Sequence, residues 1–152
     1  AAPAIKQGFL PNSISTDLHV NSMNAGMKDM TNVMSKFLNM GMTIDQVVER
    51  STWNPAKQIK REDLGNLSVG SVADVAVLKV EDGDFGYVDV LGARLMGKKN
   101  IVAEITLKDG LVHWDRNGRT RDDWDKLPKG YTAQGDPSCD GTLRTDVRSH
   151  TR

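Results

Sequence analysis

The sequence predicts an α/β protein in which a helical part is followed by a β-rich part. Between residues 27 and 59, apolar residues recur at spacings of three and four, which is typical of helices with one buried face. After Gly65, short β-favouring runs alternate with glycines, as in strands joined by tight turns. Before both parts, the short run Ile14–Thr16 favours a strand that ends at a carboxylate.

The chain opens with a pattern typical of a helix end. Residues 1–7 favour a helix, Gly8 suits the position just after its last turn, and Pro11 follows. The predicted strand Ile14–Thr16 then stops at Asp17. An Asp after a strand commonly serves as a turn or cap residue. The same place carries the chemistry in (β/α) barrels, so both interpretations of Asp17 stay open at this point.

A long amphipathic helix is predicted from Met27 to Met40. Its apolar stripe is rich in methionine, and core packing explains such a stripe better than a binding groove does, because Met readily fills gaps. The stripe consists of Met27, Met30, Val33, Met34, Phe37 and Leu38.

Two shorter helices should follow. The segment 43–46 reads Thr-Ile-Asp-Gln, a capping-box pattern, and predicts a helix that ends near Ser51 with Ile44, Val47 and Val48 facing inward. In Asn54-Pro55, the Asn suits a cap and the Pro suits the first helical position, which predicts a helix over 56–59.

The β-rich part contains one clear hairpin signal. Asp109-Gly110 lies between the β-favouring runs 101–107 and 111–114, a combination typical of a two-residue turn. In the first run, Ile101 and its alternate neighbours should form the packed face, with Glu104 on the polar one. The nearly continuous apolar run 72–80 predicts a strand covered on both faces.

Composition excludes several classes of partner. The chain has 20 Lys and Arg against 20 Asp and Glu in 152 residues, so no basic field attracts nucleic acid or an acidic membrane. Its single cysteine, Cys139, excludes an internal disulfide and has no base partner in the sequence, and no apolar run is long enough to span a membrane. No signal-peptide pattern is present, so we expect a cytoplasmic protein with no nucleic-acid and no membrane partner.

Four stretches, in order, resemble the C-terminal part of the metal-dependent amidohydrolase superfamily, and most of all its deacetylase branch, which is related to dihydroorotases and D-aminoacylases. The resemblance runs over residues 5–115 and is carried by GFLPNSISTDLH, SMNAGMKDM, STWNPAK and LGNLSVGSVADVAVL. It implies the C-terminal end of a (β/α)8 TIM-type barrel, with its last strand and helices in residues 1–62. Part of a small β-sandwich domain would follow in 63–115, and then a polar tail, partly extended or disordered, in 116–152.

The resemblance also implies a site. In the family, the Asp at the end of the eighth strand binds a divalent metal and handles the proton of the attacking water, and Asp17 occupies that position. The expected ion is zinc, in one or two copies, with most ligands supplied by chain outside this sequence. The partners implied are the N-terminal remainder of the barrel enzyme, a small-molecule substrate and further copies in a homo-oligomer.

The loop after Asp17 is the expected place for substrate contacts, which we assign to His19, Met23, Asn24 and Gly26. Extended geometry places His19 on the same side as Asp17, although a structural histidine bonded to a backbone carbonyl fits equally. Ordinary helix capping is the alternative for the rest of the loop. His113 falls in a predicted strand and is taken as structural.

Three functions follow for testing. The first is hydrolysis of an amide bond in a small N-acyl substrate by metal-activated water, as in a deacetylase. The second uses the same site for a cyclic amide, as dihydroorotases do, or for an ester. The third is a non-catalytic assembly module.

Overall fold

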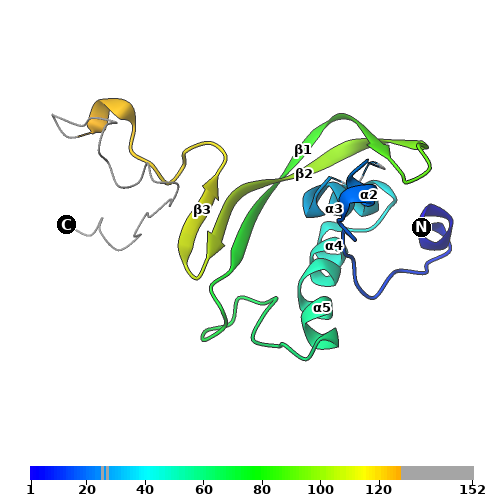
Figure 1. Ribbon diagram of the computed structural model, residues 1–152, viewed down its shortest axis with the longest axis horizontal. Coiled ribbons are helices and arrows are strands. Elements are labelled where there is room, and N and C mark those ends of the chain that lie inside the picture. The colour runs from blue at the N-terminus through cyan, green and yellow to red at the C-terminus, as the bar shows by residue number, and fades with distance from the viewer. Residues whose placement is uncertain (25, 27, 128–152) are drawn as a thin grey trace. The chain divides into compact units, whose positions relative to one another are not determined.

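The computed structural model of the protein describes residues 1–24, 26 and 28–127 (Figure 1). Five helices precede three strands, which confirms the predicted α/β class and the order of its parts. The elements are α1 (Ala2–Lys6), α2 (Val20–Asn24), α3 (Met30–Asn39), α4 (Ile44–Ser51), α5 (Trp53–Gln58), β1 (Val75–Val88), β2 (Arg94–Lys108), β3 (Leu111–Asp115) and the 3-10 turn η1 (Trp124–Lys126). In this described part, no helix has both the length and the apolarity that crossing a bilayer requires. The predicted features of the tail beyond residue 127, Cys139 among them, lie outside the described residues.

The chain divides into two compact units. Unit 1 holds residues 1–71 and 79–102, and unit 2 holds residues 72–78 and the chain from Ala103 onward. The long strands β1 and β2 each contribute to both units. The domain assignment 1–62, 63–115 and 116–152 stays a prediction.

Helix α1 ends as its sequence predicts. Gly8 adopts a left-handed φ of 83°, which a residue without a Cβ reaches at little cost. Its N–H donates to the Ile5 carbonyl at 2.9 Å, and the Phe9 N–H donates to the Ala4 carbonyl at 3.0 Å. These two bonds satisfy carbonyls that the helix end would otherwise leave open.

The predicted strand Ile14–Thr16 is wrong for the structure described. The segment carries no strand, because a strand needs a neighbour for its backbone and the sheet formed by the described residues contains only β1, β2 and β3. Ile14 is nevertheless buried, and its N–H donates to the Arg50 carbonyl at 2.8 Å. The Arg50 carbonyl, near the end of α4, therefore accepts a hydrogen bond that the backbone of a neighbouring strand would otherwise accept.

The long helix begins later than predicted. The expected helix Met27–Met40 is α3, which starts at Met30 because Asp29 caps it. The Asp29 carboxylate accepts the Asn32 N–H at 2.7 Å and the Thr31 hydroxyl at 2.8 Å. The preceding residues instead include the short helix α2, which the sequence pattern did not indicate.

The capping box of α4 is confirmed in both directions. The Thr43 N–H donates to the Gln46 side-chain oxygen at 3.0 Å, and the Gln46 N–H donates to the Thr43 hydroxyl oxygen at 3.2 Å. Val47 is fully buried as expected, whereas Ile44 is 37% exposed and does not face inward. Helix α5 starts at Trp53, before the predicted cap residue Asn54, so Asn54 lies in its first turn.

The Asp109-Gly110 turn joins β2 to β3 as predicted. Both residues have left-handed φ values, 51° and 77°, which the two-residue hairpin turn requires. Lys108 pairs with Leu111, and the register shifts after the next pair, so that His113 is the extra residue of a bulge.

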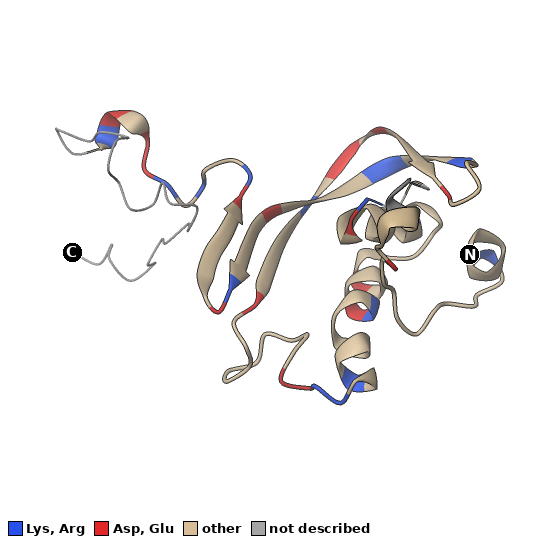
Figure 2. Cartoon of the chain, in the orientation of Figure 1, with Lys and Arg blue, Asp and Glu red and all other residues tan. Residues whose placement is uncertain are grey.

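Strand β1 is less covered than predicted. Within the run 72–80, Val77 and Val80 remain 44% and 38% exposed. The turn 89–93 joins β1 to β2, and acidic and basic positions lie along the strands of this hairpin (Figure 2). Asp82 and Asp84 of β1 form ion pairs with Lys99 and Lys98 of β2. The described residues form one three-stranded sheet in the order β1-β2-β3, so the β-sandwich remains a prediction.

In unit 1, α3 binds the backbone of β2 through two polar side chains. The Asn39 amide oxygen accepts the N–H groups of Lys98 (2.9 Å) and Lys99 (3.1 Å), and its nitrogen donates to the Lys99 carbonyl at 2.7 Å. Ser35, which is fully buried, accepts the Ile101 N–H at 2.8 Å. Because these residues are one helical turn apart, a single face of α3 fixes the strand.

The turn after β3, in unit 2, is organised by two acidic side chains. Asp115 accepts the N–H groups of Arg119 (3.0 Å) and Thr120 (2.8 Å), together with the Thr120 hydroxyl. Glu104, predicted on the polar face, is only 4% exposed, because the turn covers it and Asn117 donates to it at 2.6 Å.

Acid should loosen this turn. The hydrogen bonds from the Thr120 hydroxyl and N–H lower the pKa of Asp115 to about 2. A carboxyl whose folded pKa is depressed stabilises the folded state above its unfolded pKa, and the contribution disappears as pH falls through the folded value. We expect protection of the Arg119 and Thr120 amides against hydrogen exchange, relative to intrinsic rates, to fall between about pH 4 and pH 2. Asp115→Asn should abolish this pH dependence and Asp125→Asn should retain it, whereas protection that is flat with pH in the wild type would contradict the assignment.

Candidate functional site

Asp17 stands at the end of the extended segment that follows α1, and its side chain is exposed. Its φ of 48° lies in the left-handed region, which is uncommon for a residue with a Cβ and is tolerated best by Asn and Asp. Such backbone conformations gather at functional sites, where the surrounding structure holds them. We call residues 17–26 the site loop.

The hydroxyl of Ser22 holds the turn at Asp17. Its oxygen lies 2.7 Å from the Asp17 carbonyl, to which it donates, and it accepts the His19 N–H at 2.8 Å. The Leu18 N–H is bound by the Thr16 hydroxyl at 3.2 Å. Within the described part of the chain, no donor bonds to the Asp17 carboxylate itself, so it remains available to a ligand.

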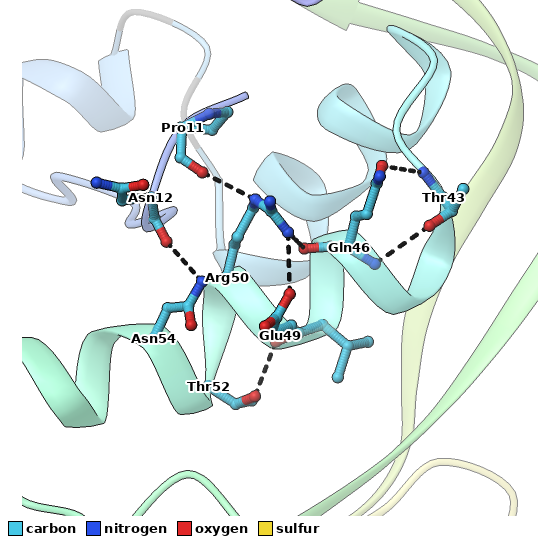
Figure 3. A network of polar contacts seen from close by, with 9 residues as sticks. Pro11, Asn12, Thr43, Gln46, Glu49, Arg50, Thr52 and Asn54 are labelled. Atoms are coloured by element: carbon cyan, nitrogen blue, oxygen red, sulfur yellow. Dashed lines mark hydrogen bonds and ion pairs between the residues drawn. The ribbon is translucent and has the colours of Figure 1, made fainter. Parts of the chain in front are cut away.

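Helices α4 and α5 fix the segment that leads into Asp17 (Figure 3). The Arg50 Nε donates to the Pro11 carbonyl at 2.9 Å, and the Asn54 amide donates to the Asn12 carbonyl at 3.0 Å. The Arg50 carbonyl in turn accepts the Ile14 N–H. Three backbone groups of residues 11–14 are therefore held by two residues of the helices.

Arg50 and Asn54, which bind the backbone of residues 11–14, form what we call the clamp. Arg50 is itself held in place. Its guanidinium also donates to the Gln46 carbonyl at 3.3 Å and to the Glu49 carboxylate at 3.1 Å (Figure 3). A planar guanidinium with several fixed donors suits such a junction better than a flexible ammonium would.

The far end of the site loop approaches β1. Gly26 has a φ of 87°, and a Cβ placed there would lie 3.1 Å from the carbonyl oxygen of Val88 and 3.2 Å from its Cβ. The Lys36 ammonium donates to the Val88 carbonyl at 2.8 Å and to the Gly26 carbonyl at 3.4 Å. At Gly26 the backbone of the site loop thus comes close to that of Val88.

The other predicted substrate residues lie along the same loop. His19 is exposed at the bend before α2, and the backbone of Met23 and Asn24 belongs to that helix, while their side chains lie outside the described part. Their substrate roles stay predictions. The sequence did not indicate the roles of Arg50 and Lys36, because no local pattern distinguishes a lysine or arginine that binds a distant carbonyl.

The chemistry of Asp17 fits that of one ligand to a divalent metal. An exposed carboxylate without a hydrogen-bond partner suits a divalent cation, and Asp17 provides it. No group of three or more His, Cys, Asp or Glu among the residues described could hold an ion. Asp17 therefore fits as a single ligand, and a complete coordination sphere needs residues beyond these.

The model of the amidohydrolase family matches residues 1–113, which include the site loop and its supports. The chain belongs to the amidohydrolase family. Among curated amidohydrolase relatives, deacetylases of Brucella anthropi and Agrobacterium fabrum are each 44% identical to it over 92 residues, 60% of this chain and 23% of theirs. A deacetylase of Enterococcus faecalis is 25% identical over 114 residues, 74% of this chain and 31% of its own length.

Solved structures agree with this membership. An adenine deaminase matches with a TM-score of 0.71 and 26% identity, over 76% of this chain and 31% of its own. A dihydroorotase matches with a TM-score of 0.67 and 36% identity, over 73% of this chain and 30% of its own. This amidohydrolase chain thus spans between about a quarter and a third of the relatives that it matches.

Proposed function

We propose that this chain forms the C-terminal part of a metal-dependent amidohydrolase that cleaves an amide bond of a small N-acyl substrate. The observation that carries the proposal is Asp17: an exposed carboxylate without a partner among the described residues, at a left-handed φ, held on both sides by the rest of the chain. The deacetylase relatives at 44% identity favour an N-acyl substrate. The surrounding architecture proposed is the end of a (β/α)8 barrel, in which such residues line the active face.

Asp17 has two roles in this proposal. A divalent metal, expected to be zinc in one or two copies, supplies Lewis-acid activation of water when bound. Asp17 would help to hold that ion, and its carboxylate would accept a proton from the attacking water and return it to the leaving amine. The substrate contacts in this proposal are made by His19, Met23, Asn24 and Gly26.

The remaining ligands belong, in this proposal, to the N-terminal remainder of the barrel. That segment is the first partner expected, and a homo-oligomer in the cytoplasm is the expected state of the whole enzyme. The likeness to a dihydroorotase, with 36% identity, favours cyclic-amide hydrolysis as the second candidate activity.

A substrate panel with metal analysis tests the proposal on the full-length enzyme. N-acetyl amino acids should give the highest kcat/KM, with hydantoins and acyl hydroxy-acids well below them, and metal should be bound in stoichiometric amount. The same preparation after chelation and metal restoration is the control, since activity should be lost and recovered. Preferred turnover of hydantoins would establish the cyclic-amide alternative, and a metal-free protein without turnover would establish an assembly module.

A further inference from the structure

Lys36 joins two backbone segments that are far apart in the sequence. It lies near the end of α3, and its ammonium donates to the Val88 carbonyl at the end of β1 and to the Gly26 carbonyl at the end of the site loop. An ammonium has three donors, so it serves both carbonyls at once. Bonds to a charged donor are also stronger than those between neutral groups.

The two segments touch without an intervening side chain. Gly26 lies so close to Val88 that a Cβ at position 26 would be 3.1 Å from the Val88 carbonyl oxygen and 3.2 Å from its Cβ, a tight fit that requires the neighbour to shift slightly. Its φ of 87° adds a second reason for glycine at this point. The site loop therefore ends directly against the strand.

Val88 can hold the end of the site loop because hydrogen bonds fix the hairpin around it, both at its tip and along its strands. The tip is closed by Asp89, whose carboxylate accepts the N–H groups of Leu91 and Ala93 at 2.9 Å each. The strands behind the tip are tied to α3 by Asn39, and the Tyr87 hydroxyl donates to the Lys99 carbonyl at 2.7 Å. All of these residues belong to unit 1.

Burial and neighbouring charges together lower the pKa of the Lys36 ammonium. Partial burial lowers the pKa of its ammonium, and Lys28 lowers it further, while Asp89 raises it. The acidic residue that closes the hairpin tip thus also favours the charged form of the lysine that binds the tip.

We propose that the β1–β2 hairpin tip, residues 88–93, is a positioning element for the site loop, with Lys36 as the positioning residue that joins them. This inference rests on the proposed function of Asp17. The Ser22 hydroxyl fixes the Asp17 turn from within the loop, and Lys36 fixes the end of the loop against the hairpin. Without Lys36, a smaller fraction of the enzyme holds Asp17 in its working position, and turnover falls in proportion to that fraction.

Lys36→Met in the full-length enzyme tests the inference. Met keeps most of the length of the side chain and removes its donors. We expect kcat to fall about 10- to 100-fold, the value of a hydrogen bond to a charged group, with KM nearly unchanged. Amides of residues 17–24 should exchange faster with solvent, while those of α4 keep their protection. Lys36→Arg should restore most of the activity, because the guanidinium offers donors to the same carbonyls.

Lys98→Met is the matched control. Lys98 is another lysine of unit 1. Its exposed ammonium pairs with Asp84 on the neighbouring strand and does not contact the site loop. Its kcat and its loop exchange should equal those of the wild type.

The outcomes separate this inference from the proposed function. Unchanged kcat and unchanged loop exchange in Lys36→Met, alongside an inactive Asp17→Asn, would overturn the positioning role alone. Lost activity with unaltered loop exchange and no rescue by Arg would also overturn it, because Lys36 would then act in another way. An active Asp17→Asn would overturn the proposed function itself.

Discussion

Asp17→Asn in the full-length enzyme is expected to lower kcat by about 10²–10⁴-fold, the usual contribution of a general acid–base group. The substitution removes the negative charge and the proton acceptor, and it keeps the shape. Asn also tolerates the left-handed φ of 48° found at this position. The fold should therefore persist, and the amount of bound metal, measured by elemental analysis beside kcat, should fall.

A second Asp of the chain provides the control for this experiment. Asp109 is also exposed and has a φ of 51°, but it lies in the turn between β2 and β3. Asn followed by Gly is as good a two-residue turn as Asp-Gly, so Asp109→Asn should leave activity and metal content intact. Near-normal turnover with full metal occupancy in Asp17→Asn would refute the assignment, because the variant lacks the carboxylate that the assignment requires.

Gly97→Ala is expected to destabilise the protein by about 2–4 kcal/mol through overpacking and lost hydrogen bonds. A Cβ at Gly97 would lie 2.4 Å from the Asn39 Cγ and 2.6 Å from its amide oxygen. A free side chain would rotate away from such a contact. Asn39 is held by the backbone of Lys98 and Lys99 and by the Ser35 carbonyl, so moving it breaks the attachment of α3 to β2.

Denaturant unfolding of two further variants shows whether this mechanism holds. Gly86→Ala is the matched control, because its new Cβ meets flexible side chains, Arg94 at 3.3 Å and Met96 at 3.9 Å, and it should cost little. Asn39→Ala should be destabilising alone, and adding Gly97→Ala to it should cost almost nothing more, since the contact is already gone. Additive losses in the double variant would show that the clash with Asn39 is not the cause.

Features decided within a few residues were predictable from the sequence. The capping box at Thr43, the helix end at Gly8 and the turn at Asp109 each depend on bonds or φ values inside one short segment. The chemistry of those residues specifies the local structure wherever they stand. These predictions are therefore confirmed in both units.

Features decided by distant neighbours were predicted less well. Ile14–Thr16 has the composition of a strand, yet its one bond to a distant backbone, from Ile14, goes to Arg50 at a helix end. The apolar periodicity begins at Met27, before the cap residue Asp29. The periodicity alone therefore predicted a helix start three residues before the observed one at Met30. Of the candidate site, Asp17 was proposed from the sequence and stays a proposal, whereas the roles of Arg50 and Lys36 depend on contacts that only the folded chain reveals.

The clamp of Arg50 and Asn54 affects which positions of the chain tolerate substitution. Arg50 and Asn54 bind carbonyl oxygens of Pro11 and Asn12, groups that every amino acid carries. The side chains at positions 11 and 12 are therefore open to exchange without loss of these bonds. The two helix residues are not, because each supplies a donor that few side chains have. Sequence drift beside Asp17 should thus be greater than drift in the helices that hold the backbone before it.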